Sequence, residues 1–180
     1  MRTSHRAPGA LMANMSATVE RSPVGVVGVI GPWNYPIFTP IGSIAYALAA
    51  GNTVVFKPSE YTPGVGVWMA ESFNSVAPFA GIFTTITGLG ETGNALCTSE
   101  INKLSFTGST RTAKLVAAAC ATQMTPVVLE CGGKDPVIVA SDANLDRAVD
   151  ATIWSAMANA GQSCIGAERV YVDEKVADLF

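Results

Sequence analysis

The residue of this sequence best suited to covalent chemistry is Cys164, in the stretch Asn159-Ala-Gly-Gln-Ser-Cys-Ile-Gly166. A thiol between two glycines, directly after a helical stretch, can be exposed at a turn with backbone N–H groups aimed at its substrate. Such N–H groups favour the thiolate and then stabilise an oxyanion. An isolated cysteine is more often a small buried residue, and the glycines leave both interpretations open. For Cys97 and Cys120, on alanine-rich helical stretches, burial is the favoured interpretation.

Glu130 is a candidate general base. It ends an apolar run and precedes two glycines, and active sites of parallel sheets gather at such strand ends. Partial burial there would suit a carboxylate to accept protons, whereas pairing with Lys134 or capping a turn is the alternative. The single histidine, His5, lies near the amino terminus, and the four cysteines form no CxxC pair. A histidine-based triad and a metal site are therefore not expected.

Three further stretches place polar residues after predicted strands. Asn34 lies between two prolines, and its amide can donate a hydrogen bond to an oxyanion. Lys57 and Glu60 can bond a ribose, where a carboxylate disfavours a 2′-phosphate. Gly108 and Ser109 join a strand to a helix whose N-terminus can receive a phosphate. Taken singly, each stretch is also explained by an ordinary turn or a solvated loop.

The elements that must position these residues alternate along the chain. Short β-branched runs separated by longer helical stretches predict a parallel sheet covered on both faces by helices. We predict strands over 24–30, 54–56, 82–86, 104–107, 127–130, 137–139 and 170–172. We predict helices over 40–50, 65–76, 92–97, from a Ser109 cap to Ala121, over 145–158, and from near Asp173 onward. Residues 1–20 fit no pattern and are predicted to be a flexible or borrowed segment.

Composition narrows the classes of protein. Hydrophobic residues make up 49% of the chain and charged residues 14%, against about a quarter charged in ordinary proteins, so we expect other protein to cover much of this surface. A net charge of −3 without a basic cluster gives no reason to expect nucleic acid. The longest apolar run is broken at Gly51 and Asn52, which disfavours a membrane span. Without a secretory signal, a cytoplasmic location with reduced thiols is expected.

Taken together and in order, these stretches resemble the aldehyde dehydrogenase superfamily from about Val24 to the last residue. The matching motifs are Gly31-Pro-Trp-Asn-Tyr-Pro36, Lys57-Pro-Ser-Glu60, Phe106-Thr-Gly-Ser109, Leu129-Glu-Cys-Gly-Gly-Lys134 and Gly161-Gln-Ser-Cys164. The resemblance implies an α/β fold, with the Rossmann-like parallel sheet of the cofactor domain and the start of an α/β catalytic domain. It divides the chain into an N-terminal segment (1–23, a remnant of an oligomerisation hairpin), part of the NAD(P)-binding domain (24–131) and a truncated catalytic domain (132–180).

The resemblance also implies roles. Cys164 matches the thiolate that forms a thiohemiacetal and then a thioester, and Glu130 matches the base for thioester hydrolysis. Asn34, with the backbone N–H of Cys164, matches the oxyanion hole. The matches to cofactor-binding residues are Trp33, Lys57, Glu60, Gly108 and Ser109. The implied reaction oxidises an aldehyde to a carboxylic acid with NAD as cofactor, favoured by Glu60, or with NADP.

Some features depart from the family or leave alternatives open. Ala113 stands where a glycine is usual, and Cys131 where a leucine is usual. The sequence around Asn34 is similar to that of bacterial members that act on aliphatic aldehydes, with succinate semialdehyde a candidate substrate. Chains of the family are far longer, so we expect a fragment, poorly soluble and with little turnover, of a homodimeric or homotetrameric parent. A CoA-acylating enzyme, which would not need Glu130 as base, and a non-catalytic remnant or part of a split enzyme are the alternatives.

Overall fold

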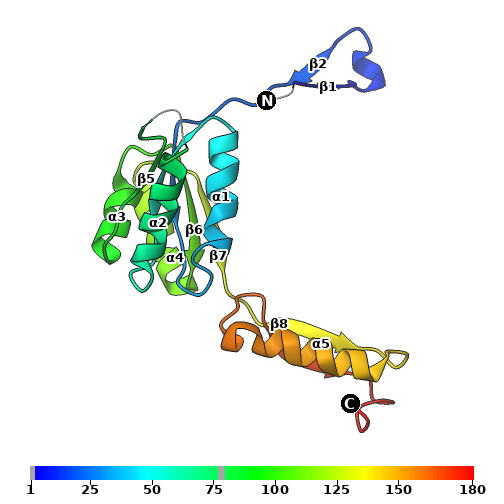
Figure 1. Cartoon of the computed structure of the whole chain (residues 1–180). Helices are drawn as coiled ribbons and strands as arrows, with labels where there is room; N and C mark the ends of the chain where they lie inside the picture. Colours follow the sequence, from blue (N-terminus) through cyan, green and yellow to red (C-terminus); the bar gives the residue numbers. More distant parts are fainter. Residues whose placement is uncertain (1–2, 77–79) are drawn as a thin grey trace.

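A five-stranded parallel sheet forms the centre of the molecule in a computed structural model, which describes residues 3–76 and 80–180. The strands are β3 (Val26–Ile30), β4 (Thr53–Lys57), β5 (Phe83–Thr85), β6 (Lys103–Gly108) and β7 (Val127–Cys131), in the order β5-β4-β3-β6-β7. All four pairings are parallel. The predicted α/β fold with a parallel sheet is confirmed (Figure 1).

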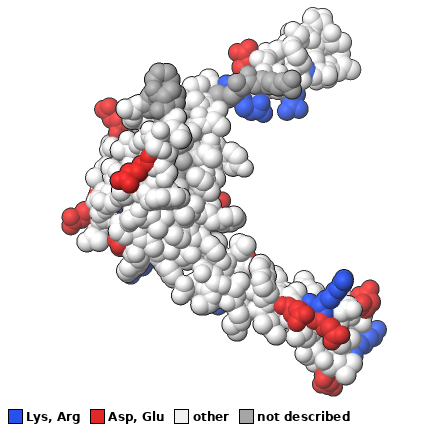
Figure 2. Space-filling model, viewed as in Figure 1, with Lys and Arg blue, Asp and Glu red and all other residues white. Residues whose placement is uncertain are grey.

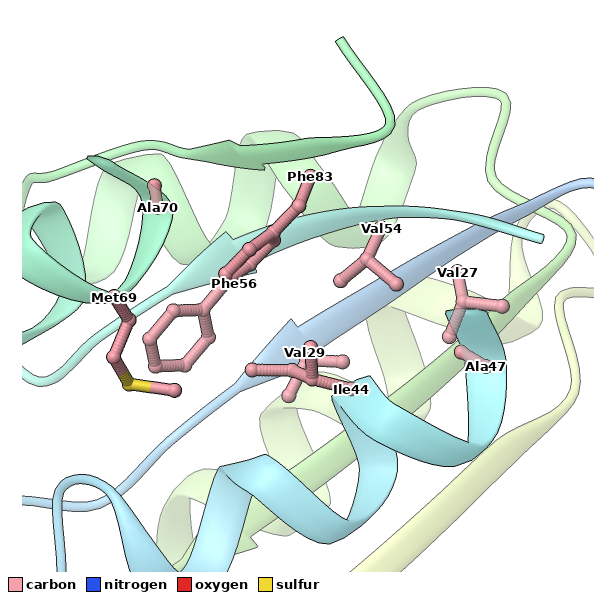
Figure 3. Packing of buried hydrophobic residues seen from close by; sticks show 9 residues of the cluster. All are labelled: Val27, Val29, Ile44, Ala47, Val54, Phe56, Met69, Ala70 and Phe83. Atoms are coloured by element: carbon pink, nitrogen blue, oxygen red, sulfur yellow. The ribbon is translucent and has the colours of Figure 1, made fainter. Parts of the chain in front are cut away.

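Four helices connect these strands: α1 (Phe38–Ala49), α2 (Pro63–Asn74), α3 (Gly90–Thr98) and α4 (Thr110–Ala121). The sheet and its helices, residues 26–131, are called the body below. Side chains alternate across the sheet because successive residues of a strand point to opposite faces. One buried cluster joins Val27 and Val29 to α1 and α2, and a second joins Ile30 to α3 and α4. Figure 3 shows the first cluster, with Phe56 and Ile44 among its fully buried members.

The strand order contains a reversal that matters for function. From β3 the chain moves to β4 and β5 on one side, and then returns to place β6 on the other side of β3. Ile30, the last residue of β3, therefore lies between Lys57 of β4 and Phe106 of β6. In open parallel sheets, the carboxyl ends of strands that flank such a reversal border a crevice suited to ligands.

A second, smaller unit follows the body. Strands β8 (Asp135–Val139) and β9 (Ala167–Val172) pair in parallel and are connected by α5 (Leu145–Met157) and the short 3-10 helix η2 (Ala158–Gly161). This C-terminal unit, residues 135–172, projects from the body (Figure 1). No residue of α5 is buried, and Trp154 is 74% exposed. Most of the surface in Figure 2 is uncharged, and both signs of charge gather at the far end of this unit.

The two ends of the chain differ in how they compare with the sequence-based expectations. Residues 1–20 were predicted to be a flexible or borrowed segment, with a hairpin remnant implied by the family resemblance; strands β1 (Ser4–Arg6) and β2 (Ala17–Val19) form an antiparallel hairpin around a short 3-10 helix, η1 (Ala10–Met12). The helix expected from Asp173 is wrong, because residues 173–180 form turns closed by bonds such as Val176 N–H to the Asp173 carbonyl. Elsewhere the predicted elements are present, with ends that coincide or are shifted by up to three residues. Among the described helices, none is both long and apolar enough to cross a membrane.

Candidate active site

The predicted site residues line one cleft of about 1110 Å³ at the carboxyl edge of the sheet. Loops that follow β3, β4, β6 and β7 form one side, together with the first turns of α3 and α4, and the loop after η2 forms the other. The sequence-predicted residues in its lining are Trp33, Asn34, Lys57, Glu60, Gly108, Ser109, Glu130 and Cys164. Side chains that are 130 positions apart in sequence are therefore gathered around one space.

Lys57 and Glu60 form one wall of the cleft at the end of β4. The Lys57 side chain is only 4% exposed; its Nζ donates to the Pro58 carbonyl at 3.1 Å and lies 3.9 Å from Glu60 Oε2. Burial lowers the pKa of Lys57, and the Glu60 carboxylate partly opposes this shift. An ammonium has three donors, so Nζ retains N–H groups for a ligand, while the half-exposed Glu60 offers acceptors beside it.

The N-terminus of α4 faces the cleft beside Ser109. As predicted, Ser109 caps this helix, with its Oγ accepting from the Thr112 N–H at 3.2 Å. The N–H groups at the start of a helix have no partner within the helix, and the helix dipole makes this end positive. A Cβ on Gly108 would lie 2.7 Å from the Phe106 ring, so the turn requires glycine there. Arg111 also lines the cleft.

These donors fit a dinucleotide, which carries two ribose groups joined by an anionic pyrophosphate. The first turn of α4 contains no acidic residue that would compete for its N–H groups, and Lys57 with Glu60 supplies the donor and acceptor pair that ribose hydroxyls need. Sequence reasoning missed Arg111. Its signal was a cation in the first turn of a helix, where the dipole disfavours positive charge.

Asn34 and the loop that carries Cys164 are in direct contact. The Asn34 amide donates to the Gln162 carbonyl at 2.7 Å, and the Asn159 amide donates to the Asn34 carbonyl at 3.1 Å. The Cys164 thiol is exposed two residues beyond Gln162. One of the two amide N–H groups of Asn34 is thus used within the protein, and the other remains available for a ligand oxygen.

Glu130 lies at the end of β7, opposite Thr107 of β6. Its side chain is exposed, so the partial burial that would suit it to accept protons is not found. The alternative pairing with Lys134 is also absent, because Lys134 pairs with Glu168 of β9. Glu130 therefore keeps a carboxylate free at the rim of the cleft, beside the half-buried Cys131.

Two other cysteines behave as core residues. Cys97 of α3 and Cys120 of α4 have no exposed surface, and the buried interpretation is confirmed for both. Burial raises the pKa of Cys97 to about 12, with a further contribution from the neighbouring Cys120. Burial likewise raises the pKa of Cys120. Because the thiolate is the reactive form, these two thiols are inert compared with an exposed one.

The fold and cleft place the chain among the α/β proteins that bind ligands at the switch point of a parallel sheet. Residues 2–180 match the aldehyde dehydrogenase family, and the chain belongs to that family. It is 40% identical to 2-hydroxymuconic semialdehyde dehydrogenase of Pseudomonas sp. (strain CF600), over 89% of this chain and 34% of that protein. It is also 40% identical to betaine aldehyde dehydrogenase 1 of Oryza sativa subsp. japonica, over 97% of this chain and 35% of that protein.

Solved structures agree with this family. An NADP-dependent enzyme of E. coli superposes with a TM-score of 0.90 at 39% identity, covering 99% of this chain and 37% of that one. PnpE, solved in complex with nicotinamide adenine dinucleotide, gives a TM-score of 0.90 at 36% identity, covering 100% of this chain and 37% of that one. The chain therefore spans about a third of the length of its relatives.

Proposed function

We propose that this chain carries the nucleophile, the oxyanion donor, the base and part of the cofactor site of an aldehyde dehydrogenase. The whole protein would oxidise an aldehyde to a carboxylic acid with NAD or NADP. The observation that carries the proposal is the convergence of the eight predicted residues on one cleft, with Asn34 bonded to the loop of Cys164. In domain terms, 24–131 would belong to the cofactor domain and 132–180 to the catalytic domain.

The first step is attack of the Cys164 thiolate on the aldehyde carbon. The S–C bond forms, and the carbonyl oxygen gains the negative charge. The free amide N–H of Asn34 and the backbone N–H of Cys164 donate to this oxygen. Donors fixed before the reaction stabilise the charge without reorganising.

Binding of the cofactor uses the opposite wall of the cleft. Lys57 and Glu60 would hold ribose hydroxyls, Ser109 and the N-terminus of α4 would meet the pyrophosphate, and Trp33, which is 45% exposed, would lie along the cofactor. When bound, NAD or NADP would supply the hydride acceptor, and loss of hydride from the thiohemiacetal carbon would leave a thioester on Cys164. The Glu60 carboxylate disfavours a 2′-phosphate and so favours NAD, while the NADP-dependent relative keeps NADP as an alternative.

Glu130 completes the cycle as a general base. It removes a proton from a water molecule, which attacks the thioester carbon. The C–S bond then breaks, the carboxylic acid leaves and the Cys164 thiolate is regenerated. The exposed position of Glu130 at the rim leaves it accessible to that water. This step needs neither a histidine nor a metal ion.

The proposal extends to the substrate and the assembly. A relative whose name is a semialdehyde dehydrogenase supports an aliphatic aldehyde that also bears a carboxylate, with succinate semialdehyde as the candidate. The exposed hairpin β1–β2, with Leu11 and Met15 open to solvent, supports a role for 1–23 in forming a homodimer or homotetramer. We propose a cytoplasmic location because an active-site thiol must stay reduced.

The test is made on the whole protein and distinguishes the proposed roles of Glu130 and Cys164. Glu130→Gln should preserve a rapid initial burst of NADH, one per Cys164, and lower the steady rate of acid formation about 100-fold or more, since general base catalysis contributes roughly that much. Cys164→Ser should abolish both. Equal loss of burst and steady rate in Glu130→Gln would contradict the role as base. Formation of acyl-CoA independently of Glu130 would indicate the acylating alternative, and failure to bind NAD at all would indicate a remnant or part of a split enzyme.

A further inference from the structure

Asn159 occupies the junction between the body and the C-terminal unit. Its amide donates to the Asn34 carbonyl at 3.1 Å and to the Gln162 carbonyl at 3.4 Å. Asn34 in turn donates to that same Gln162 carbonyl at 2.7 Å. The three residues thus form a closed set of hydrogen bonds directly before Cys164, and Asn159 donates to both partners.

These hydrogen bonds link the two parts of the molecule beyond the covalent connection of the chain. Across residues 3–76 and 80–180, only the bonds that Asn34 makes with Gln162 and with Asn159 join the body to the C-terminal unit. The oxyanion donor lies on the body and the nucleophile on the unit, so their separation depends on these contacts. A hydrogen bond whose loss changes a reacting geometry by 1 Å can cost about 100-fold in rate.

The backbone at this junction is unusual as well. Asn159, Ala160 and Gly161 follow one another with φ of 54°, 58° and 73°, all left-handed. Asparagine adopts this conformation more readily than other residues with a side chain, because its short amide can bond locally. Asn159 is therefore suited both to the turn and to the two carbonyl groups that its amide reaches.

We propose that Asn159 is a positioning residue, which holds the Asn34 amide against the Cys164 loop so that both can act on one carbonyl oxygen. The inference rests on the proposed function and goes beyond it, because Asn159 itself touches neither substrate nor cofactor. Removal of its amide leaves the functional groups of Asn34 and Cys164 intact but no longer fixes their relative position. Addition of an aldehyde to Cys164 then loses the stabilisation from Asn34.

The experiment measures thiohemiacetal formation without cofactor, in the 180-residue chain. The S–C bond forms, and the thiol proton passes to the carbonyl oxygen, so bound aldehyde protects Cys164 from iodoacetamide. Peptide mapping by mass spectrometry gives the concentration of propanal that halves alkylation at Cys164. Asn159→Gly should raise this concentration about 10-fold, the effect of about one lost hydrogen bond, and Asn159→Asp should raise it further because a carboxylate would face two carbonyl oxygens.

Two controls separate positioning from unfolding. Alkylation of Cys164 without propanal should change less than about twofold in Asn159→Gly, because glycine tolerates a left-handed turn. Met124→Gly is the matched control: Met124 also has a positive φ, of 57°, but it is 87% exposed and does not line the cleft. In this variant, propanal should protect Cys164 from alkylation at the same concentration as in the parent chain.

Hydrogen exchange supplies a readout that is independent of the aldehyde. Asn159→Gly should accelerate exchange both in the peptide around Asn34 and in the peptide around Cys164. Acceleration confined to the Cys164 peptide, or an unchanged propanal midpoint, would overturn the positioning role. If the parent chain itself shows no protection by propanal although both peptides exchange faster in Asn159→Gly, the proposed function fails while the structural link stands.

Discussion

The body and the C-terminal unit differ in how they are held together. The body has two buried clusters, one on each face of its sheet, and each contains nine buried residues. The C-terminal unit contributes Val139 as its one buried hydrophobic residue among those described, and α5 has no buried side chain. The proposed cofactor wall of the cleft is therefore built on a packed scaffold, whereas Cys164, the proposed nucleophile, lies on a weakly packed one. The two hydrogen bonds of Asn34 must therefore hold the Cys164 loop in position, as packing holds the loops of the body.

Truncation of one large aromatic side chain in each part should give the largest contrast. Phe56→Ala removes a ring that is 1% exposed and packs against Phe83, and should lower the free energy of unfolding by about 3–5 kcal/mol. Trp154→Ala removes a ring that is 74% exposed, and should change it by less than about 0.5 kcal/mol. Urea denaturation followed by circular dichroism measures both.

A large loss in Trp154→Ala would mean that the exposed face of α5 is covered in solution. Self-association is the simplest cause, and it would make the midpoint depend on protein concentration. Measurement at two concentrations tenfold apart distinguishes this from packing within one chain. Other large apolar side chains of the unit, Ile138, Met157 and Ile165, are also more than half exposed, so the result bears on the expected poor solubility.

The same contrast decides how well the sequence predicts the fold. In the body, strands such as Val54 to Phe56 are buried on both faces and read as continuous β-branched runs, and the predicted elements are all present. The errors fall at the ends, where burial is slight. The segment 173–180 has the apolar spacing of a helix at Val176, Leu179 and Phe180, but none of these three side chains is buried in the fold. The hairpin β1–β2 forms from two strands of only three residues each, which are too short to give a strand pattern in the sequence.

The candidate site also has features that could be predicted from the sequence and features that could not. Strand ends in a parallel sheet meet at one edge, so the neighbourhood of Lys57, Ser109 and Glu130 could be predicted from the strands alone. The exposure of Glu130 could not be, because it depends on what lies across the cleft from β7. Asn159 was missed for a related reason: its partner Asn34 is 125 positions away, and only the tertiary fold brings them together.

The buried thiol of Cys97 should also make the stability of the body depend on pH. Burial raises the pKa of Cys97 to about 12 from 9.0, so the folded chain disfavours its thiolate. The unfolded chain loses this proton first as the pH rises, and the free energy of unfolding should therefore fall above about pH 9. The full difference from this group at pH 10 is about 1.4 kcal/mol relative to pH 7.

The check compares denaturation midpoints at pH 8 and pH 10 in the parent chain and in Cys97→Ala. The variant should lose less stability over this interval. Lys57, whose pKa burial lowers, acts in the opposite direction, but it is present in both proteins and cancels in the comparison. Identical pH slopes would show that Cys97 does not titrate differently in the folded chain.

The two capped helices give the smallest and most local contrast. Ser109 accepts a hydrogen bond from the Thr112 N–H in α4, and Asn144 accepts one from the Arg147 N–H in α5. Replacement of either cap by alanine costs about 1 kcal/mol of helix stability. Because α4 is packed into the body, Ser109→Ala should lower the global free energy of unfolding by about that amount. Because α5 buries nothing, Asn144→Ala should leave the urea midpoint of the body unchanged and speed hydrogen exchange in α5 alone about fivefold. If Asn144→Ala instead shifts the midpoint as much as Ser109→Ala does, the two parts unfold as one cooperative unit, and the Cys164 loop is held by more than the bonds of Asn34 and Asn159.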